Sequence, residues 1–295
     1  MPDPSEPDPS EPDPTSPTGP NRPDAAPRSA AGYVFADPAH RVAPNHHRRL
    51  LELLAETLDP FSCRRLEQAG AGPDARCLEI GAGTGSIAHW LANRLAPTGQ
   101  VIATDLDPSL IAPHQRITTL PHDISRDQLP GRFDLIHARL ILAHLPDRHH
   151  ILGKLSEALN PGGALIIEDF DPGWDRCLLH TPDPDAYRLF NAYHHALTAV
   201  LRHAGADPGW ARRTHQAMHQ VGLINIDTEL WSRAWHGGQP GCLLPHTAAT
   251  QLAEQLTTTG QMVPDDLDRL RALLLDPRLI ISGNTAISTT GHRAP

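Results

Sequence analysis

The sequence is poor in lysine: Lys154 is the only one among 25 lysine and arginine residues, and the formal net charge is −9. Non-specific binding of nucleic acid needs a basic surface that follows the phosphates. The charge balance therefore argues against a nucleic-acid partner. Six acids and two arginines within residues 1–30 account for four of the nine negative charges, so the rest of the chain is only mildly acidic.

Long apolar runs and closely spaced cysteines are also missing. No stretch approaches the roughly 18–20 apolar residues of a membrane span, and the start lacks the basic-then-apolar layout of a secretion signal. We therefore expect a cytoplasmic protein with no membrane partner. The four cysteines lie singly, without C-x-x-C spacing, which favours buried thiols over a zinc knot or a disulfide framework; they are Cys63, Cys77, Cys177 and Cys242.

Histidine is abundant, at 19 residues, but no metal site stands out. Neighbouring pairs such as His194 and His195 are typical of solvated helix faces. Asp169 and Asp171 are suitable metal ligands, yet no third and fourth ligand accompanies them. The sequence therefore predicts no metal.

Residues 1–30 differ from the rest of the chain. They repeat Asp-Pro-Ser-Glu-Pro, contain ten prolines and have almost no large apolar side chain. Such a segment cannot bury enough surface to offset its chain entropy. We expect a disordered, partly polyproline-like tail, with partner binding as the alternative. No linker-like stretch interrupts the remainder, so residues 31–295 are predicted to form one domain.

Strand and helix patterns alternate along the first half of that domain. Two helices, 50–58 and 64–69, are predicted to end at Asp59-Pro60 and at Gly70. The expected strands are 76–80, 100–104, 117–120, 133–140 and 164–170, with helices over 86–95 and 148–159 between them. This alternation predicts a Rossmann-like, doubly wound α/β fold with helices on both faces of a mostly parallel sheet.

The rhythm changes after the fifth strand. Two further strands are expected at 224–231 and 279–289, which brings the sheet to seven. Helices are predicted over 186–204, 210–221, 247–258 and 265–275. The last two form an insertion that could cover a site at the carboxyl ends of the strands, where ligands of such sheets bind. Gly237–Gly241 (GGQPG) has the composition of a hinge or lid loop.

The stretch LEIGAGTG joins the first strand to its helix through glycines at 81, 83 and 85. A tight turn with a ligand close to the backbone needs glycines of this kind. A dinucleotide fold would place its third glycine or alanine at 86, where this chain has Ser86. Asp105 ends the second strand, where a carboxylate can accept both hydroxyls of an adenosine ribose.

The ordered motifs LEIGAGTG, TDLD, HDI, FDLIHARLILAHLPD and LNPGGALIIEDFD resemble those of class I S-adenosylmethionine-dependent methyltransferases, of the bacterial type found with specialised metabolism. The resemblance covers roughly residues 33 to 295. It implies S-adenosylmethionine as the cofactor. The cofactor-binding positions that it implies are Tyr33, Glu79, Gly81, Ala82, Gly83, Gly85, Asp105, Leu106, Asp123, Ile124, His137 and Ala138.

Within that set, the resemblance gives each residue a role. Glu79 and the glycine loop would hold the methionine part, Asp105 the ribose and Leu106 the adenine face. Asp123 would take the adenine amino group with Ile124 beside it, while His137 and Ala138 would line the sulfonium. Plain structural roles are the alternatives, with Asp105 capping a helix and Asp123 capping a turn.

A hydroxyl acceptor needs a base near the methyl group. The candidates for catalytic residues are His144, just after the fourth strand, Asp169, at the end of the fifth, and His194, on the helix that follows. Apolar walls for an acceptor could come from Trp174, Tyr187, Tyr193, Trp231 and Trp235, or these could seal the insertion onto the sheet.

The sequence predicts methyl transfer to a small molecule, most simply to an oxygen of a specialised metabolite. Nitrogen, carbon or a peptide carboxylate are alternative acceptors. A second alternative is a protein that binds the cofactor and promotes a cyclisation or rearrangement instead, because fold does not dictate reaction. A homodimer is left open.

Overall fold

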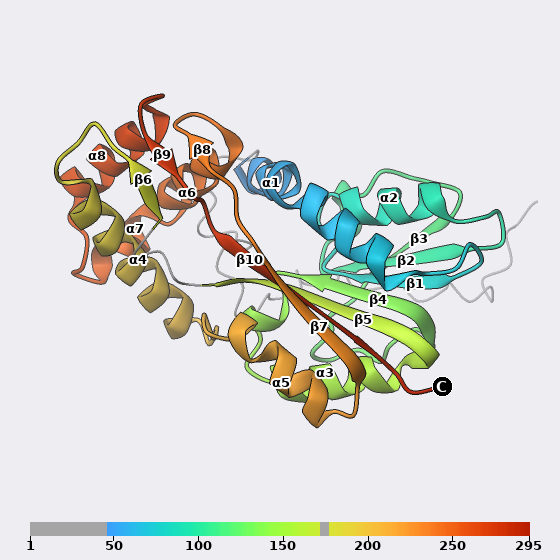
Figure 1. Ribbon diagram of the computed structural model, residues 1–295. Coiled ribbons are helices and arrows are strands. Elements are labelled where there is room, and N and C mark those ends of the chain that lie inside the picture. Colours follow the sequence, from blue (N-terminus) through green and yellow to red (C-terminus); the bar gives the residue numbers. More distant parts are fainter. Residues whose placement is uncertain (1–45, 172–176) are drawn as a thin grey trace, which may run out of the picture.

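The computed structural model describes residues 46–171 and 177–295. A seven-stranded sheet has the strand order β3-β2-β1-β4-β5-β10-β7, in which β10 alone runs antiparallel to its two neighbours (Figure 1). Its strands are β1 (Arg76–Ile80), β2 (Gln100–Asp105), β3 (Ile117–Pro121), β4 (Phe133–Arg139), β5 (Leu159–Asp171), β7 (Ile224–Trp231) and β10 (Thr285–His292). The predicted fold class and strand number are confirmed.

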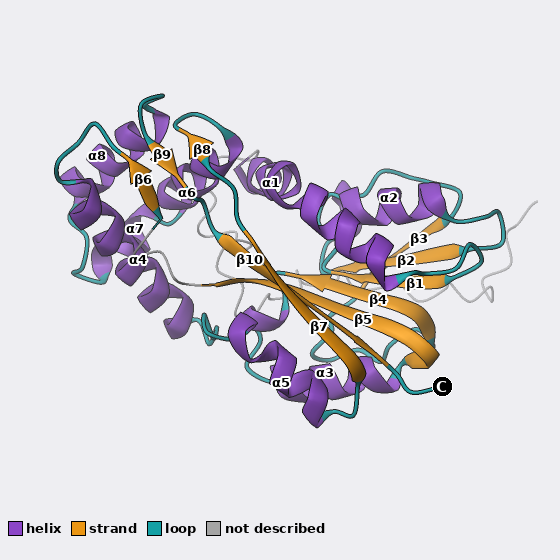
Figure 2. Cartoon of the chain, in the orientation of Figure 1, coloured by secondary structure: helices purple, strands orange, loops and turns teal. Residues whose placement is uncertain are grey.

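Both faces of this sheet are covered, as expected for strands that are apolar on both sides. Helices α1 (His46–Ala69) and α2 (Ser86–Arg94) lie on one face, and α3 (Arg148–Glu157) and α5 (Thr214–Gln220) lie on the other (Figure 2). In β1, Cys77 packs toward α2 and Leu78 toward α3 and α5. Glu79 therefore points to the α1 and α2 face, although it stands in a strand that is otherwise buried and apolar.

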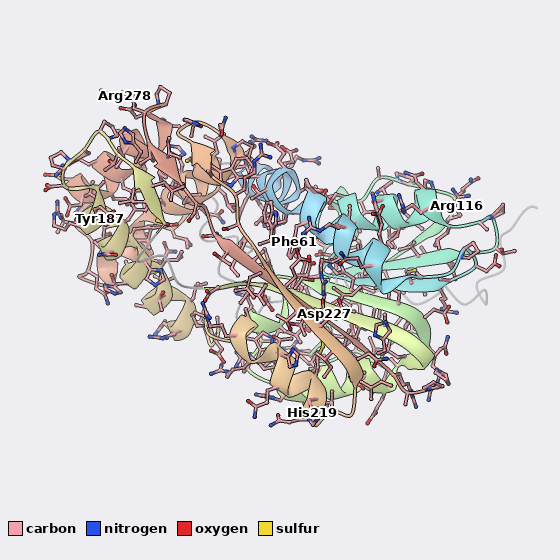
Figure 3. All side chains as sticks on the ribbon, viewed as in Figure 1. Phe61, Arg116, Tyr187, His219, Asp227 and Arg278 are labelled. Carbon is pink, nitrogen blue, oxygen red and sulfur yellow. The ribbon has the colours of Figure 1, made fainter. Side chains whose placement is uncertain are left out.

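Helix α1 replaces the two helices predicted from the sequence. It continues through Pro60, which removes one backbone N–H from the helix ladder but leaves the remaining bonds in place. Leu58 and Phe61, on either side of the proline, are both buried, and the Phe61 ring stacks on Trp231 with centroids 5.5 Å apart (Figure 3). Tertiary packing thus holds together a helix that local sequence would break.

A separate group of elements packs around its own hydrophobic core, which we call the helical lobe. It contains α4 (Ala186–His203), α6 (Pro240–Gln251), α7 (Ala253–Thr258), α8 (Pro264–Leu275) and the short strands β6 (Leu178–His180), β8 (Trp235–His236) and β9 (Ile280–Ile281). Helix α4 forms because its apolar residues recur at helical spacing and share one buried face, which includes Leu189, Phe190 and Tyr193. The lobe lies beside the ends of β5, β7 and β10 (Figure 1).

The structure of the helical lobe differs from the sequence prediction in three details. Three helices, not two, separate β7 from β10, and α6 begins at Pro240, inside the expected lid loop. Gly241 packs on the Trp235 ring so closely that a Cβ would lie 2.2 Å from it, which makes this turn a packed element. The predicted last strand is divided at Gly283, whose φ of +65° lets the chain leave β9 in the three-stranded sheet and enter β10.

The remaining short elements are the 3-10 turns η2 (Pro108–Leu110), η3 (Leu142–His144) and η5 (Ala211–Arg213). The predicted helix 210–221 is therefore split into η5 and α5. Within the two described ranges, every helix is too short or too polar to cross a bilayer.

Candidate functional site

The glycine loop after β1 adopts a backbone that side chains disfavour. Gly81, Gly83 and Gly85 have φ values of 65°, 57° and 81°, in the left-handed region that glycine enters at no steric cost. A Cβ on Gly81 would also lie 2.1 Å from Ile141 Cδ1. The Ala82 N–H donates to the Thr104 carbonyl at 2.9 Å, which holds the loop against β2. The loop therefore presents bare backbone at the carboxyl edge of the sheet.

Asp105 stands at the end of β2, directly beside this loop. Its Oδ2 accepts the Gly83 N–H at 2.8 Å and its Oδ1 accepts the Asp107 N–H at 3.1 Å. Each carboxylate oxygen still has a second acceptor direction. Burial raises the pKa of Asp105 above its ordinary value, against the lowering effect of these N–H groups and of His47 from α1. The side chain that caps η2 is Asp107, so Asp105 does not have the capping role.

Asp123 lies next to Asp105, because the His122 N–H donates to the Asp105 carbonyl at 2.8 Å. Asp123 Oδ1 accepts the Ser125 N–H at 3.0 Å, so this residue does cap a turn. The other oxygen of Asp123, Oδ2, lies 3.6 Å from Arg126 Nε, and the Asp123 side chain is partly exposed. Leu106 is half-buried and Ile124 is buried, so the structure gathers all four residues around the ends of β2 and β3.

The structure places His137 and Ala138 inside β4, and their predicted position beside the sulfonium stays a prediction. Both are buried in β4, with His137 at 0 % and Ala138 at 1 % exposure. The Nδ1 of His137 lies 2.8 Å from Glu79 Oε2, and its Nε2 lies 3.3 Å from Glu168 Oε2. Sequence patterning could not show this, because adjacent parallel strands bring the three side chains together only in the folded sheet.

This buried cluster continues into helix α1. The Ser62 hydroxyl donates to Glu168 Oε2, and Arg139 Nη1 donates to the Ser62 oxygen and to Asp59 Oδ1, both at 2.9 Å. Ser86, the first residue of α2, donates to the same Asp59 oxygen at 3.2 Å. We call the set the buried relay; its members are Glu79, His137, Glu168, Ser62, Arg139, Asp59 and Ser86.

Within the buried relay, the side chains of His137 and Glu168 are charged at neutral pH. Burial by itself would lower the pKa of His137, but the two carboxylates outweigh it and raise the value to about 9. Burial would likewise raise the pKa of Glu168, yet the hydrogen bond and charge of His137, with Arg139 and Ser62, lower it to about 2. An imidazolium between two carboxylates is the consistent state at neutral pH.

Asp169 and His144 lie on the other side of the same edge. Asp169 is buried on β5 at the level of Leu140, just past the end of β4, and burial raises its pKa well above the ordinary value. His144 ends η3; burial first and Arg148 second lower its pKa to about 4, so it is neutral at pH 7. Leu140 has a φ of 57°, an uncommon conformation for leucine that marks the bend out of β4.

The other predicted residues are dispersed. His194 lies on α4 beside His195, with ring centroids 5.9 Å apart, and its catalytic role stays a prediction. Tyr187 is 56 % exposed on the outer side of α4 (Figure 3), whereas Tyr193 and Trp235 are buried in the lobe core. Trp231 alone joins the edge, where it packs with Leu54, Leu140 and Phe170.

Three predicted features lie where the structure makes no statement, and the residues that it describes hold no cluster of metal ligands. Tyr33, Trp174 and the tail 1–30 lie outside the described residues. Across 46–171 and 177–295, no three histidine, cysteine, aspartate or glutamate side chains gather in a way that could hold a metal ion.

Fold and loop together define the class: a Rossmann-like protein whose glycine loop and second-strand carboxylate meet at the carboxyl edge of the sheet. A family model described as a methyltransferase domain matches residues 45–208, more than half of the sequence. The chain therefore belongs to this methyltransferase-domain family, as the sequence motifs predict. Membership of this family identifies S-adenosylmethionine as the cofactor.

Individual relatives are more distant. Methyltransferase str2 of Strobilurus tenacellus is 34% identical over 128 residues, which cover 41% of this chain and 45% of the relative. The ubiquinone/menaquinone biosynthesis C-methyltransferase UbiE of Cupriavidus taiwanensis is 27% identical over 118 residues, or 37% and 49% of the two chains. The chain thus spans about half the length of these curated relatives.

Among solved structures, a protein from Bacillus halodurans C-125 superposes with a TM-score of 0.53 at 14% identity. The match covers 80% of this chain and all of the other. At that identity the likeness concerns the fold alone.

The residues present fit S-adenosylmethionine. Asp105 retains acceptor directions for a ribose, and the glycine loop offers backbone that a Cβ would obstruct. Leu51 of α1 lies in ordinary contact distance of Gly83, so α1 borders the same space.

Proposed function

We propose that this protein transfers the methyl group of S-adenosylmethionine to an oxygen of a small, largely apolar specialised metabolite. The observation that carries the proposal is the Gly83 N–H bond to Asp105, which joins the glycine loop to a carboxylate with acceptor capacity to spare. Family membership over residues 45–208 supports the same donor.

In this proposal the chain binds and orients two reactants at one edge. Asp105 accepts the ribose hydroxyls, Asp123 the adenine amino group, and Leu106 lies against the adenine. Glu79 and the loop amides hold the amino-acid part. The cofactor supplies a methyl group activated by its sulfonium, so the main tasks of the protein are alignment and exclusion of water.

The acceptor pocket is assigned to the carboxyl ends of β4, β5 and β7. Leu140, Phe170 and Trp231 come from those three ends, and Leu54 and Phe61 from α1 pack against them. An apolar, aromatic-lined surface favours an acceptor that is itself largely apolar. The relative from Strobilurus tenacellus, named only as a methyltransferase, adds no acceptor atom.

Of the three candidate bases, Asp169 and His144 lie at this edge, and Asp169 is the better of these two. A hydroxyl acceptor must lose its proton, and a base works best when its pKa lies near the working pH. Burial moves the pKa of Asp169 upward, toward that range, whereas His144, with a pKa of about 4, binds a proton weakly. We therefore assign proton removal to Asp169 and a binding role to His144. Because Asp169 points to the face of β5 opposite Phe170, this assignment requires the acceptor hydroxyl to reach past the apolar cluster to the η3 side of the edge.

We expect Asp169→Asn to lower kcat at least tenfold, in line with the usual contribution of a positioned base, and to leave the Kd for S-adenosylhomocysteine unchanged. In the wild type, kcat should rise with pH through the raised pKa of Asp169, because only the carboxylate accepts the proton. Steady-state rates with the identified acceptor give both quantities. Asp171→Asn is the matched control, since Arg212 already holds that carboxylate with Nε at 2.8 Å. Equal kcat for both variants would remove Asp169 from the mechanism.

The proposal is tested by incubating the full chain with deuterated-methyl S-adenosylmethionine and fractionated host metabolites and peptides, followed by mass spectrometry. A product heavier by one labelled methyl group establishes transfer, and fragmentation distinguishes oxygen from nitrogen, carbon or a peptide carboxylate. Calorimetry with S-adenosylhomocysteine runs in parallel. Binding without any labelled product, across extracts that support a known methyltransferase, would contradict methyl transfer and favour a non-methylating role.

A further inference from the structure

The His137 side chain is fully buried, and its contacts indicate whether the imidazole is neutral or charged. It is 0 % exposed, and both of its ring nitrogens face carboxylate oxygens, Glu79 at 2.8 Å and Glu168 at 3.3 Å. A neutral imidazole carries a proton on one nitrogen only and would turn a lone pair toward one of these carboxylates. The Nδ1 hydrogen bond to Glu79 and the ion-pair distance from Nε2 to Glu168 therefore favour an imidazolium.

We propose that His137 is a positioning residue for the cofactor: as a buried imidazolium, it fixes the orientation and charge of Glu79 beneath the glycine loop. This inference rests on the proposed cofactor site, because Glu79 is the carboxylate assigned to the amino-acid part. His137 itself touches neither cofactor nor acceptor.

Charge balance explains why the loop needs this residue. Without the imidazolium, Glu79 on β1 and Glu168 on β5 would be two buried carboxylates on either side of β4, and one of them would have to take up a proton. With it, both carboxylates stay ionised, so Glu79 keeps its negative charge. That charge suits the ammonium and sulfonium groups of S-adenosylmethionine.

The relay also connects this charge to helix α1. Glu168 accepts the Ser62 hydroxyl, and Arg139 joins Ser62 to Asp59, which in turn holds Ser86 at the end of the glycine loop. The same helix places Leu51 against Gly83 and His47 near Asp105. Loss of the imidazolium is therefore expected to affect the loop from both β1 and α1.

The charged and titratable groups around His137 come from four elements. Glu79 faces it from β1, Glu168 from β5 and Arg139 from its own strand β4, while α1 contributes Asp59 and the Cys63 thiol. Of the protein groups around His137, only His137 itself is expected to change charge between pH 7 and 10, because its pKa is about 9 and burial raises that of Cys63 to about 12. The ammonium of the ligand titrates in the same range, so the informative quantity is the difference between the wild type and a His137 variant. Wild-type affinity for the cofactor should thus fall as the pH rises through about 9.

The test is isothermal calorimetry of S-adenosylhomocysteine with the full chain, at several pH values between 7 and 10. We expect His137→Gln, which keeps a donor but loses the charge, to weaken binding about tenfold at pH 7 and to make the fall toward pH 10 smaller than in the wild type, leaving only the part that comes from the ammonium of the ligand. Glu168→Gln should move that fall to lower pH, because one carboxylate no longer stabilises the imidazolium. This second variant keeps the inference testable if His137→Gln does not fold.

Arg65→Met is the matched control for a purely structural role. Arg65 is also ionically paired on the buried face of α1, but its contacts are with side chains of β7 and β10, namely Asp227, Glu229, Ser288 and Thr290. It should lose stability and keep the wild-type affinity and pH profile. Unchanged affinity in His137→Gln, or equal losses in Arg65→Met, would overturn the inference. Absence of binding by the wild type would instead contradict the proposed function, on which the inference depends.

Discussion

Asp105→Ala is expected to weaken the binding of S-adenosylhomocysteine about a hundredfold. The substitution removes two hydrogen bonds from a carboxylate to ribose hydroxyls, each contributing about 1.5 kcal/mol when one partner is charged. It also releases the Gly83 N–H that Asp105 accepts at 2.8 Å, so the loop loses an anchor. Calorimetry of the full chain measures the change. Because burial raises the pKa of Asp105, wild-type affinity should fall when the pH is lowered through that raised value.

Asp107→Ala is the matched control for this variant. Asp107 lies two residues further on, is exposed, and caps η2 through the Ser109 N–H at 3.1 Å. Loss of the cap should cost about 1 kcal/mol of stability without a change in affinity. Similar affinities for Asp105→Ala and the wild type would show that the cofactor ribose lies elsewhere.

Glu168→Ala is expected to lower the free energy of unfolding by about 3–5 kcal/mol, the usual result when one partner of a buried ion pair is removed. The substitution leaves His137 with a single carboxylate and frees the Ser62 hydroxyl inside the protein. Urea unfolding monitored by circular dichroism gives the difference. Glu67→Ala is the control: its ion pair with Arg94 joins α1 and α2 on the same sheet face, but both side chains are about half exposed, so the loss should stay below about 1 kcal/mol.

The Glu168–His137 pair makes the stability of the wild type depend on pH in both the acidic and the alkaline range. Glu168, with a pKa lowered from 4.5 to about 2, contributes stability above pH 4.5 that is lost as the pH falls toward 2. His137, with a pKa raised from 6.5 to about 9, contributes stability below pH 6.5 that is lost as the pH rises through 9. Glu168→Ala should therefore flatten both limbs. If the variant keeps the wild-type profile, the buried pair is not their source.

The parts of the fold that depend on local pattern could be predicted closely. The strands β1, β3 and β7 were expected within one residue of their observed bounds, because short apolar runs and turn residues define them. Helix α1 and the end of the chain could not. Pro60 locally favours the end of a helix, and Gly283 locally favours a bend in a strand. The chain bends at Gly283, but tertiary packing keeps α1 continuous through Pro60.

For the site, a pattern signal was present but incomplete. Glu79, His137 and Glu168 are ionisable residues that directly follow buried apolar residues in three strands, and such interruptions indicate a buried polar cluster. Which of them pair depends on strand order and register. Ser62 and Asp59, from a helix that precedes the sheet, carry no signal of their own in the sequence.

By itself, the sequence determined the family, the seven-stranded α/β fold and the places of the glycine loop and Asp105, because these depend on residue types at short spacing. The tertiary structure alone decided that His137 is enclosed between two carboxylates, that Asp169 is buried at the carboxyl edge and that α1 covers the loop. Burial and charge pairing arise from segments distant in the chain, so no local pattern contains them.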